Sequence, residues 1–210
     1  MNNFIKPLSI LKLSISLSFF QINFSNAQTI CYDNFEGNKS ISYSYKSGKL
    51  DSSCTNPFPD KVNNSSKCAK YARNNEFKFD VIKMKLNGKL LDVSPYTTHY
   101  GIPPKLKMKL FSNAPVGTLI EVLFGNSQKN NAYPGGTHSQ FQAYTTKKGE
   151  WEELTFTFAQ IPEGSETSSV EIDQITILFN PNSMSKDTFY FDEITGPLLL
   201  NDPKNIDGTK

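Results

Sequence analysis

The side chains whose types and spacing best suit chemistry lie on one short stretch, residues 137–145. Four ring or amide side chains alternate there with small or apolar ones: His138, Gln140, Gln142 and Tyr144. A β-strand places alternate residues on one face, so these four would share a surface. Planar amides pair with sugar hydroxyls and aromatic rings stack on the apolar faces of pyranoses, whereas an ordinary solvent-facing strand is rich in Lys, Glu and Thr. The pattern therefore indicates a surface for neutral sugar hydroxyls.

Two loops carry further ring side chains. The polar loop 126–136, directly before this stretch, contains Tyr133, and an earlier loop contains Tyr96, His99 and Tyr100. We expect these side chains to form walls of the same surface if folding brings the loops close to it.

Acidic residues stand at both ends of the chain. Asp33 and Glu36 lie near the start, and Asp192 and Glu193 lie near the end. Terminal strands of a sandwich often lie side by side, and oxygen ligands from both could then hold a hard cation such as Ca²⁺. The spacing by itself fits two solvated strand ends equally well.

Three cysteines allow one disulfide. Cys54 and Cys68 flank a loop rich in Asn, Pro and Ser, and closing a loop of about 15 residues stabilises by roughly 3 kcal/mol in the chain-entropy model. We favour this pair and leave Cys31 free, although Cys31 with either partner stays open because spacing does not fix connectivity. Zinc is disfavoured, since the chain has no Cys-x-x-Cys and only two histidines.

The elements that must position these groups are strands. Apolar residues alternate with polar ones over residues 106–110, 154–158, 175–179 and 189–191, and residues 118–124 are apolar on both faces, as in a central strand. The alternation changes phase within residues 77–86, which predicts a β-bulge. About nine such strands separated by Gly and Pro turns predict an all-β protein, a two-sheet antiparallel β-sandwich or jelly roll.

The first 27 residues read as a secretory signal peptide. Residues 1–27 contain no acid, carry Lys6 and Lys12 before an apolar run, and end with small residues at positions 25 and 27. We expect cleavage near Ala27, a folded domain over 28–200 and a flexible tail over 201–210. The mature protein should be secreted, to the cell exterior, periplasm or surface, and no later segment is apolar enough to insert into a membrane.

Charge excludes one class of partner and leaves another open. The whole chain carries a net charge of +2, which disfavours a nucleic-acid partner. Between Lys39 and Lys109 there are 14 basic and 5 acidic residues, and between Leu110 and Asp202 there are 4 basic and 12 acidic ones. This sorting fits complementary parts of one folded body, or a basic face for an anionic polymer.

Several segments resemble a known family. Their sequence patterns are similar to those of the galactose-binding-like jelly rolls, a family that includes carbohydrate-binding modules of secreted bacterial (Bacteroidetes-type) proteins. The segments are Phe35-Glu36, 56–71, 151–158 and 188–194. The resemblance implies a structural calcium bound by Glu36 and Asp192, with backbone carbonyls near Asn38 and Lys39 completing its shell. It also implies a polysaccharide or oligosaccharide ligand and secreted glycan-degrading enzymes as partners. The sugar-binding residues vary within the family and are not carried over.

Two segments of the sequence partly match those of glycan-degrading enzymes. Glu171-Ile172-Asp173 resembles the Glu-x-Asp of laminarinase-like glucanases, but the second catalytic Glu is missing. Jelly-roll lyases that resemble alginate lyases use Gln, His, Tyr and Arg, of which the 137–145 stretch supplies three types, but their order differs and Arg73 is the only Arg. We therefore predict a non-catalytic carbohydrate-binding protein. The alternatives are a jelly-roll polysaccharide lyase and a structural or adhesive surface protein without a sugar site.

Overall fold

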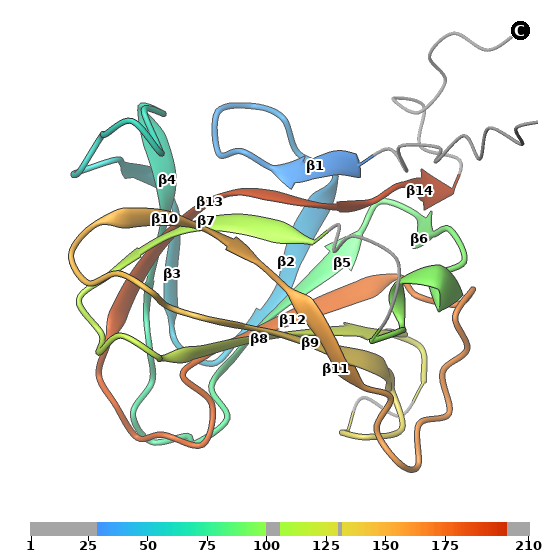
Figure 1. The fold of residues 1–210 in the computed structure, drawn as a ribbon. Coiled ribbons are helices and arrows are strands. Elements are labelled where there is room, and N and C mark those ends of the chain that lie inside the picture. Colours follow the sequence, from blue (N-terminus) through green and yellow to red (C-terminus); the bar gives the residue numbers. More distant parts are fainter. Residues whose placement is uncertain (1–28, 100–105, 130–131, 201–210) are drawn as a thin grey trace, which may run out of the picture.

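Alternating apolar residues produce a protein built almost wholly of strands, in two facing layers (Figure 1). The computed structural model describes residues 29–99, 106–129 and 132–200. The expected signal peptide and tail lie outside these ranges, as does Tyr100. The predicted fold, a two-sheet antiparallel β-sandwich, is confirmed.

Each layer is a six-stranded antiparallel sheet. In the first, sheet A, the order is β10 (Trp151–Thr155), β7 (Lys107–Ser112), β13 (Thr188–Pro197), β4 (Lys67–Ala72) and β3 (Lys49–Thr55), with β1 (Thr29–Asp33) also paired to β13. In the second, sheet B, the order is β11 (Thr157–Gln160), β9 (Thr137–Tyr144), β8 (Leu119–Gly125), β12 (Gln174–Phe179), β5 (Val81–Leu86) and β2 (Ile41–Lys46). A small ribbon of β14 (Leu199–Leu200) and β6 (Lys89–Leu90), and the 3₁₀ turn η1 (Ser94–Tyr96), complete the described elements.

The core fills the space between the sheets with apolar side chains from alternate strand positions. Phe179 of sheet B stacks on Phe189 of sheet A, with ring centroids 4.8 Å apart, and packs against Phe191. All six residues of β12 are buried, including the polar Gln174 and Thr176 that face away from the core. Burial of outward-facing residues means that the outer face of sheet B is hollowed at its centre.

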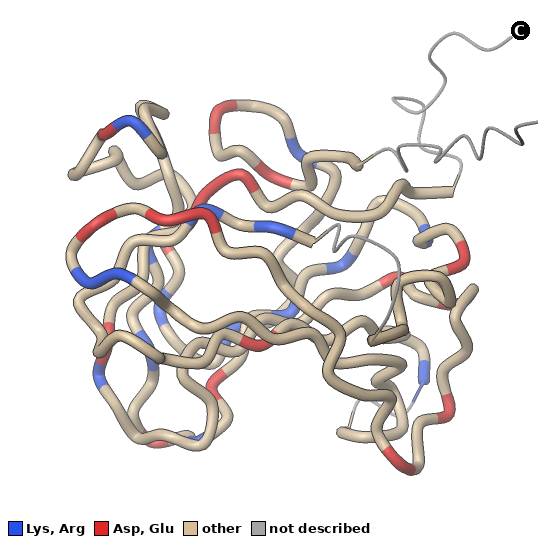
Figure 2. Tube along the Cα trace, viewed as in Figure 1, with Lys and Arg blue, Asp and Glu red and all other residues tan. Residues whose placement is uncertain are grey.

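The two ends of the folded chain meet in sheet A, as predicted. β1 pairs with β13, with Thr29 opposite Pro197 (Figure 1). The charge-sorted parts of the chain also meet there, because basic β7 lies between acidic β10 and β13 (Figure 2). Lys107 pairs with Glu153 at 2.6 Å and Lys109 with Glu193 at 2.7 Å.

Residues 154–158, predicted to lie in one strand, belong to two. β10 belongs to sheet A and β11 to sheet B, so the chain crosses from one layer to the other between them. Buried Phe156 lies at the crossing, and its N–H donates to the carbonyl of Leu106 at 3.0 Å. Alternation continues across the crossing because both strands turn an apolar face to the same core.

The β-bulge predicted within residues 77–86 is wrong. The strand begins only at Val81, and the residues before it form a loop in which Phe77 and Phe79 are exposed. Buried Asp80 ends this loop and accepts hydrogen bonds from the side chains of Ser47 and Tyr71. The change of phase is therefore the boundary between a loop and a strand.

No helix in the described part of the chain is long and apolar enough to span a membrane.

Candidate functional site

A groove crosses the outer face of sheet B. Its main hollow, of about 630 Å³, is lined by residues of five strands and of the loops at their ends. A smaller hollow of about 370 Å³ shares Lys83 and Gln174 with the first and extends to β2. We call the two together the groove.

Strand register builds the floor of the groove from rows that cross the sheet. The middle row spans all six strands, from β11 to β2: Gln160, Gln140, Leu123, Thr176, Lys83 and Tyr45. One flanking row contains Gln142, Glu121, Leu178 and Val81, and the other contains Thr137, Gly125, Gln174, Lys85 and Ser42. Five strand spacings make the middle row about 24 Å long, which suits an extended chain better than a compact ligand.

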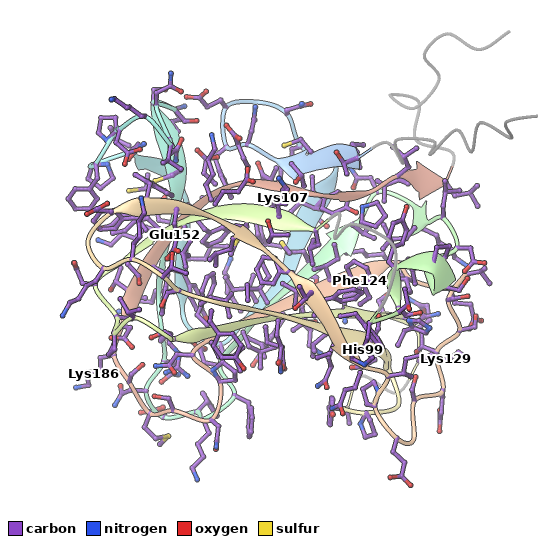
Figure 3. All side chains as sticks on the ribbon, viewed as in Figure 1. His99, Lys107, Phe124, Lys129, Glu152 and Lys186 are labelled. Atoms are coloured by element: carbon purple, nitrogen blue, oxygen red, sulfur yellow. The ribbon has the colours of Figure 1, made fainter. Side chains whose placement is uncertain are left out.

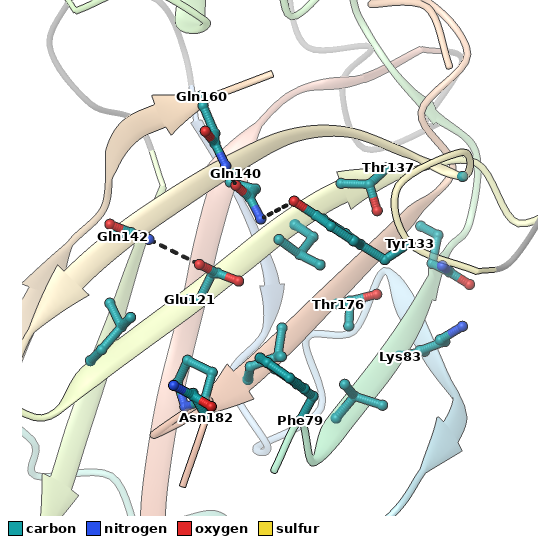
Figure 4. A pocket seen from close by; sticks show the side chains of 17 residues that line it. Phe79, Lys83, Glu121, Tyr133, Thr137, Gln140, Gln142, Gln160, Thr176 and Asn182 are labelled. Carbon is teal, nitrogen blue, oxygen red and sulfur yellow. Dashed lines mark hydrogen bonds between the residues drawn. The ribbon is translucent and has the colours of Figure 1, made fainter. Parts of the chain in front are cut away.

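Hydrogen bonds fix the amides at the β11–β9 end. Gln160 donates to the side-chain oxygen of Gln140, and Gln140 donates in turn to the Tyr133 hydroxyl at 3.2 Å (Figure 4). In the neighbouring row, Gln142 donates to Glu121 at 2.9 Å. The amide planes are thus oriented before any ligand arrives, which lowers the entropy lost on binding.

The glutamines of this protein are concentrated in the groove. Among the described residues there are five, and every one lines it: Gln128, Gln140, Gln142, Gln160 and Gln174. They come from three strands and one loop that are far apart in the sequence. A sheet face that contacts only water is expected to carry mostly Lys, Glu and Thr, so this concentration of uncharged amides indicates a binding surface.

Exposed aromatic rings border the groove. Tyr133, Phe79 and Tyr45 are 56%, 61% and 53% exposed, respectively, and each lines one of the two hollows. Large apolar side chains are normally buried, so three exposed rings along one groove mark a binding surface.

Arg73 holds the loops that form one rim. Its buried guanidinium donates to the carbonyls of Ser183 at 2.9 Å and Ser185 at 3.2 Å, and also to that of Phe77 at 3.4 Å. It lies 3.8 Å from the Asp80 carboxylate. The two loops that Arg73 joins, 74–80 and 180–187, supply Phe79 and Asn182 to the groove (Figure 4).

Three of the residues predicted from the sequence line the groove: Tyr133, Gln140 and Gln142. Tyr144 is exposed at the end of β9, opposite Leu119 of the lining but outside the lining itself. The face assigned to His138 is wrong. A bulge in the β8–β9 pairing turns this imidazole into a buried position beside Ser139, and Thr137 takes its place on the groove face.

The loop residues predicted as a wall do not line the groove. Tyr96 is half-buried and packs against the main core. His99 lies beside β11, with its ring 5.0 Å from that of Phe158 (Figure 3). Sequence reasoning also missed the contributions of β5, β8 and β12. The only signal was the polar Gln174 and Thr176 in an otherwise apolar strand.

The carboxylates predicted to bind calcium contact the β3–β4 loop. Glu36 accepts hydrogen bonds from the N–H and hydroxyl of Ser66 at 2.6 and 2.7 Å, and these bonds lower the pKa of its carboxyl group. Buried Asp192 accepts from the Asn63 amide at 3.0 Å, and desolvation raises the pKa of its carboxyl group. Both contact the β3–β4 loop through protein donors.

Within the described residues, no three His, Cys, Asp or Glu side chains converge as metal ligands. The donors around Glu36 and Asp192 are N–H and O–H groups that a cation would have to displace, so the residues present do not fit a calcium shell. Calcium stays a prediction of the family resemblance, and nothing proposed below depends on it.

The cysteines are thiols in the structure, so the predicted disulfide is not formed there. Cys54 and Cys68 are nevertheless direct partners in the β3–β4 register. The Cys54 sulfur is directed to the carbonyl of Thr55 at 3.2 Å rather than bonded across the strands.

Comparison with protein-family models finds no match, and comparison with curated protein sequences finds none either. Solved structures do match. A family 30 carbohydrate-binding module has a TM-score of 0.52 and 9% identity, over 84% of this chain and 91% of that one. An exo-β-agarase has a TM-score of 0.50 and 13% identity over 83% of this chain, which spans only 25% of the agarase.

A family 11 carbohydrate-binding module from Clostridium thermocellum has a TM-score of 0.45 and 14% identity, over 83% of this chain and 98% of that one. At such identities the likeness concerns the fold. The chain thus has the β-sandwich fold seen in a solved family 30 carbohydrate-binding module, which confirms the fold that the sequence resemblance implies.

Proposed function

We propose that this protein is an exported, non-catalytic carbohydrate-binding protein that holds a stretch of polysaccharide or oligosaccharide in the groove. The observation that carries the proposal is the gathering of all five described glutamines in the groove. Amides offer a donor and an acceptor at fixed spacing, which matches neighbouring sugar hydroxyls.

Binding combines hydrogen bonds with ring contact. Gln140 and Gln142 are oriented by Tyr133 and Glu121, and their remaining donor and acceptor positions serve the ligand. The exposed rings of Phe79 and Tyr133 offer apolar surface at the rim. Each hydrogen bond contributes only about 0.5–1.5 kcal/mol net, so we expect weak to moderate affinity that increases with the length of the glycan.

The fold supports the same proposal, because one solved structure that shares it is described as a carbohydrate-binding module. In the agarase, the matching region is a quarter of a longer chain. We propose by analogy that this protein acts beside secreted glycan-degrading enzymes.

Affinity electrophoresis through gels that contain soluble polysaccharides tests the proposal. The double variant Gln140→Ala with Gln142→Ala should lose about tenfold or more in affinity, since two hydrogen-bonding side chains are removed. Asn64→Ala, an exposed amide on the β3–β4 loop, is the matched control and should migrate like the wild type.

Gln140 is buried, so its loss could also perturb folding. Phe79→Ala removes an exposed ring and should weaken binding without lowering the melting temperature. If no polysaccharide retards the wild type, the proposal fails. Unsaturated product released from a uronate polymer would replace it with the lyase alternative.

A further inference from the structure

The two ends of the groove differ in charge. Its lining contains three charged side chains among the described residues, namely Lys83, Lys85 and Glu121. Glu121 lies on β8 and accepts the hydrogen bond from Gln142. Both lysines lie on β5, two residues apart and on the same face. The β9–β8 end is therefore rich in amides, and the β5–β2 end is cationic.

The residues paired with the two lysines on the neighbouring strands are uncharged. On β12, Thr176 is opposite Lys83 and Gln174 is opposite Lys85. On β2, Tyr45 is opposite Lys83 and Ser42 is opposite Lys85.

The acid next to Gln174 in the sequence is directed elsewhere. Asp173 precedes Gln174, and both its oxygens accept hydrogen bonds from Ser127, at 2.7 Å each. Lys85 itself has no ion pair within the described part of the chain.

Lysines on an exposed strand usually point into solvent and do nothing more. Here they line a hollow of about 370 Å³ together with the exposed ring of Tyr45 and the amide of Gln128. β5 is also an interior strand, with β12 on one side and β2 on the other. Lysines on an edge strand can prevent pairing with another chain, but β5 is not an edge strand, so these two lysines do not have that role. Their ammonium groups lie next to the Tyr45 ring, which can contact a sugar ring.

We propose that the groove selects an anionic glycan. A carboxylate or sulfate on one sugar unit lies between Lys83 and Lys85, and the uncharged units beyond it lie on the glutamines. This inference rests on the proposed function and adds to it the chemical class of the ligand. The sorting of basic residues into the first part of the chain then has a purpose at this site, since β5 and β2 both belong to that part.

Calorimetric titration with matched oligosaccharides tests the inference. The ligands are an oligosaccharide in which uronate units alternate with neutral sugars, the same oligomer with its carboxylates reduced to alcohols, and a sulfated galactan oligomer. We expect the charged forms to bind more tightly than the reduced one, and their advantage to shrink as salt screens the lysines.

The double variant Lys83→Gln with Lys85→Gln should weaken binding of the charged ligand roughly threefold to tenfold more than it weakens binding of the reduced ligand, which is the range for two exposed ion pairs. Lys49→Gln with Lys89→Gln is the matched control, because it removes the same charge at exposed positions outside the groove.

Comparing the uronate ligand with the sulfated ligand distinguishes the two possible anionic groups. Tighter binding of one of them shows whether the lysines hold a carboxylate or a sulfate. Equal affinity for charged and reduced ligands, or an unchanged double variant, would overturn the inference and leave the proposed function standing. Failure of every glycan to bind would remove both.

Discussion

At the scale of single residues, one extra residue in β9 decides whether the His138 imidazole faces the groove or the interior. The bulge in the β8–β9 pairing buries His138, whereas Gln140 and Gln142 reach the groove as alternation predicts. Burial lowers the pKa of the His138 imidazole, an effect that the nearby Asp92 partly opposes. A side chain expected to contact ligand is instead part of the folded interior.

The lowered pKa of His138 predicts a pH effect on stability. The unfolded chain binds the proton more readily than the folded one, so His138 destabilises the fold as the pH falls below its ordinary pKa of 6.5. The free energy of unfolding, from urea titrations at about pH 7 and about pH 5, should fall less in His138→Gln than in the wild type. An equal fall in both proteins would refute this assignment.

The contacts of Glu36 and Asp192 predict the response to chelation. Because Ser66 and Asn63 already satisfy these carboxylates, we expect EDTA to leave the melting temperature unchanged. Glu36→Gln should lower it, since the hydrogen bonds from Ser66 lose their charged acceptor. A drop of several degrees with EDTA in the wild type, absent in Glu36→Gln, would instead establish the calcium implied by the family resemblance.

At the scale of elements, the groove depends on two loops that Arg73 joins. Arg73 bridges the 74–80 and 180–187 loops through backbone carbonyls, which a planar fork of donors can reach and a single ammonium cannot. The rim of the groove is therefore held by a buried residue that is not part of the groove lining.

Arg73→Lys should loosen both loops. We expect faster amide hydrogen exchange in 74–80 and 180–187, little change in the β3–β4 loop, and weaker glycan binding, because Phe79 and Asn182 lose their fixed positions. Arg73→Ala should destabilise the whole fold by about 3–5 kcal/mol, since it leaves buried Asp80 without its cation. Unaltered exchange in the two loops of the Lys variant would contradict the bridging role.

The pairing of β3 with β4 predicts a cross-link under oxidising conditions. Cys54 and Cys68 are direct partners across the two strands, so oxidised glutathione should convert both thiols to a disulfide and be reduced to two glutathione molecules. Burial raises the pKa of the Cys68 thiol to about 12, so oxidation should be slow at neutral pH.

Thiol titration of the unfolded protein should then fall from three reactive groups to one, and Cys31→Ser should not affect the cross-link. Closing this loop should raise the free energy of unfolding by about 3 kcal/mol in the chain-entropy model. Three thiols after prolonged oxidation would show that the strands cannot bring the sulfurs together.

At the scale of the whole molecule, the two sheets have different roles. Sheet A joins the ends of the folded chain and the charge-sorted segments, while sheet B carries the groove on its outer face. The core packs against the inner face of sheet B. This packing determines the positions of the groove residues on the outer face of the same strands.

Export is a property of the full chain and has its own test. Expression with residues 1–27 in a secreting bacterial host should give a protein whose N-terminus, by mass spectrometry, is Gln28. Deleting residues 2–27 should leave the protein inside the cell. An exported product that still begins with Met1 would contradict the cleavage.

The sequence by itself determined the class of the fold. Period-two alternation fixes which side of each strand is apolar, and two such layers are the simplest way to bury those sides. The sequence also placed Tyr133, Gln140 and Gln142 on a shared surface, because these positions are local to one loop and one strand.

Only the tertiary structure decided which strands are neighbours. Lys83, Gln174 and Gln160 enter the same groove because register joins β5, β12 and β11 through strands distant in sequence. The bulge at His138 likewise depends on pairing between two strands. Local patterns encode the faces of strands, whereas the order and register of strands arise from the packing of the whole core.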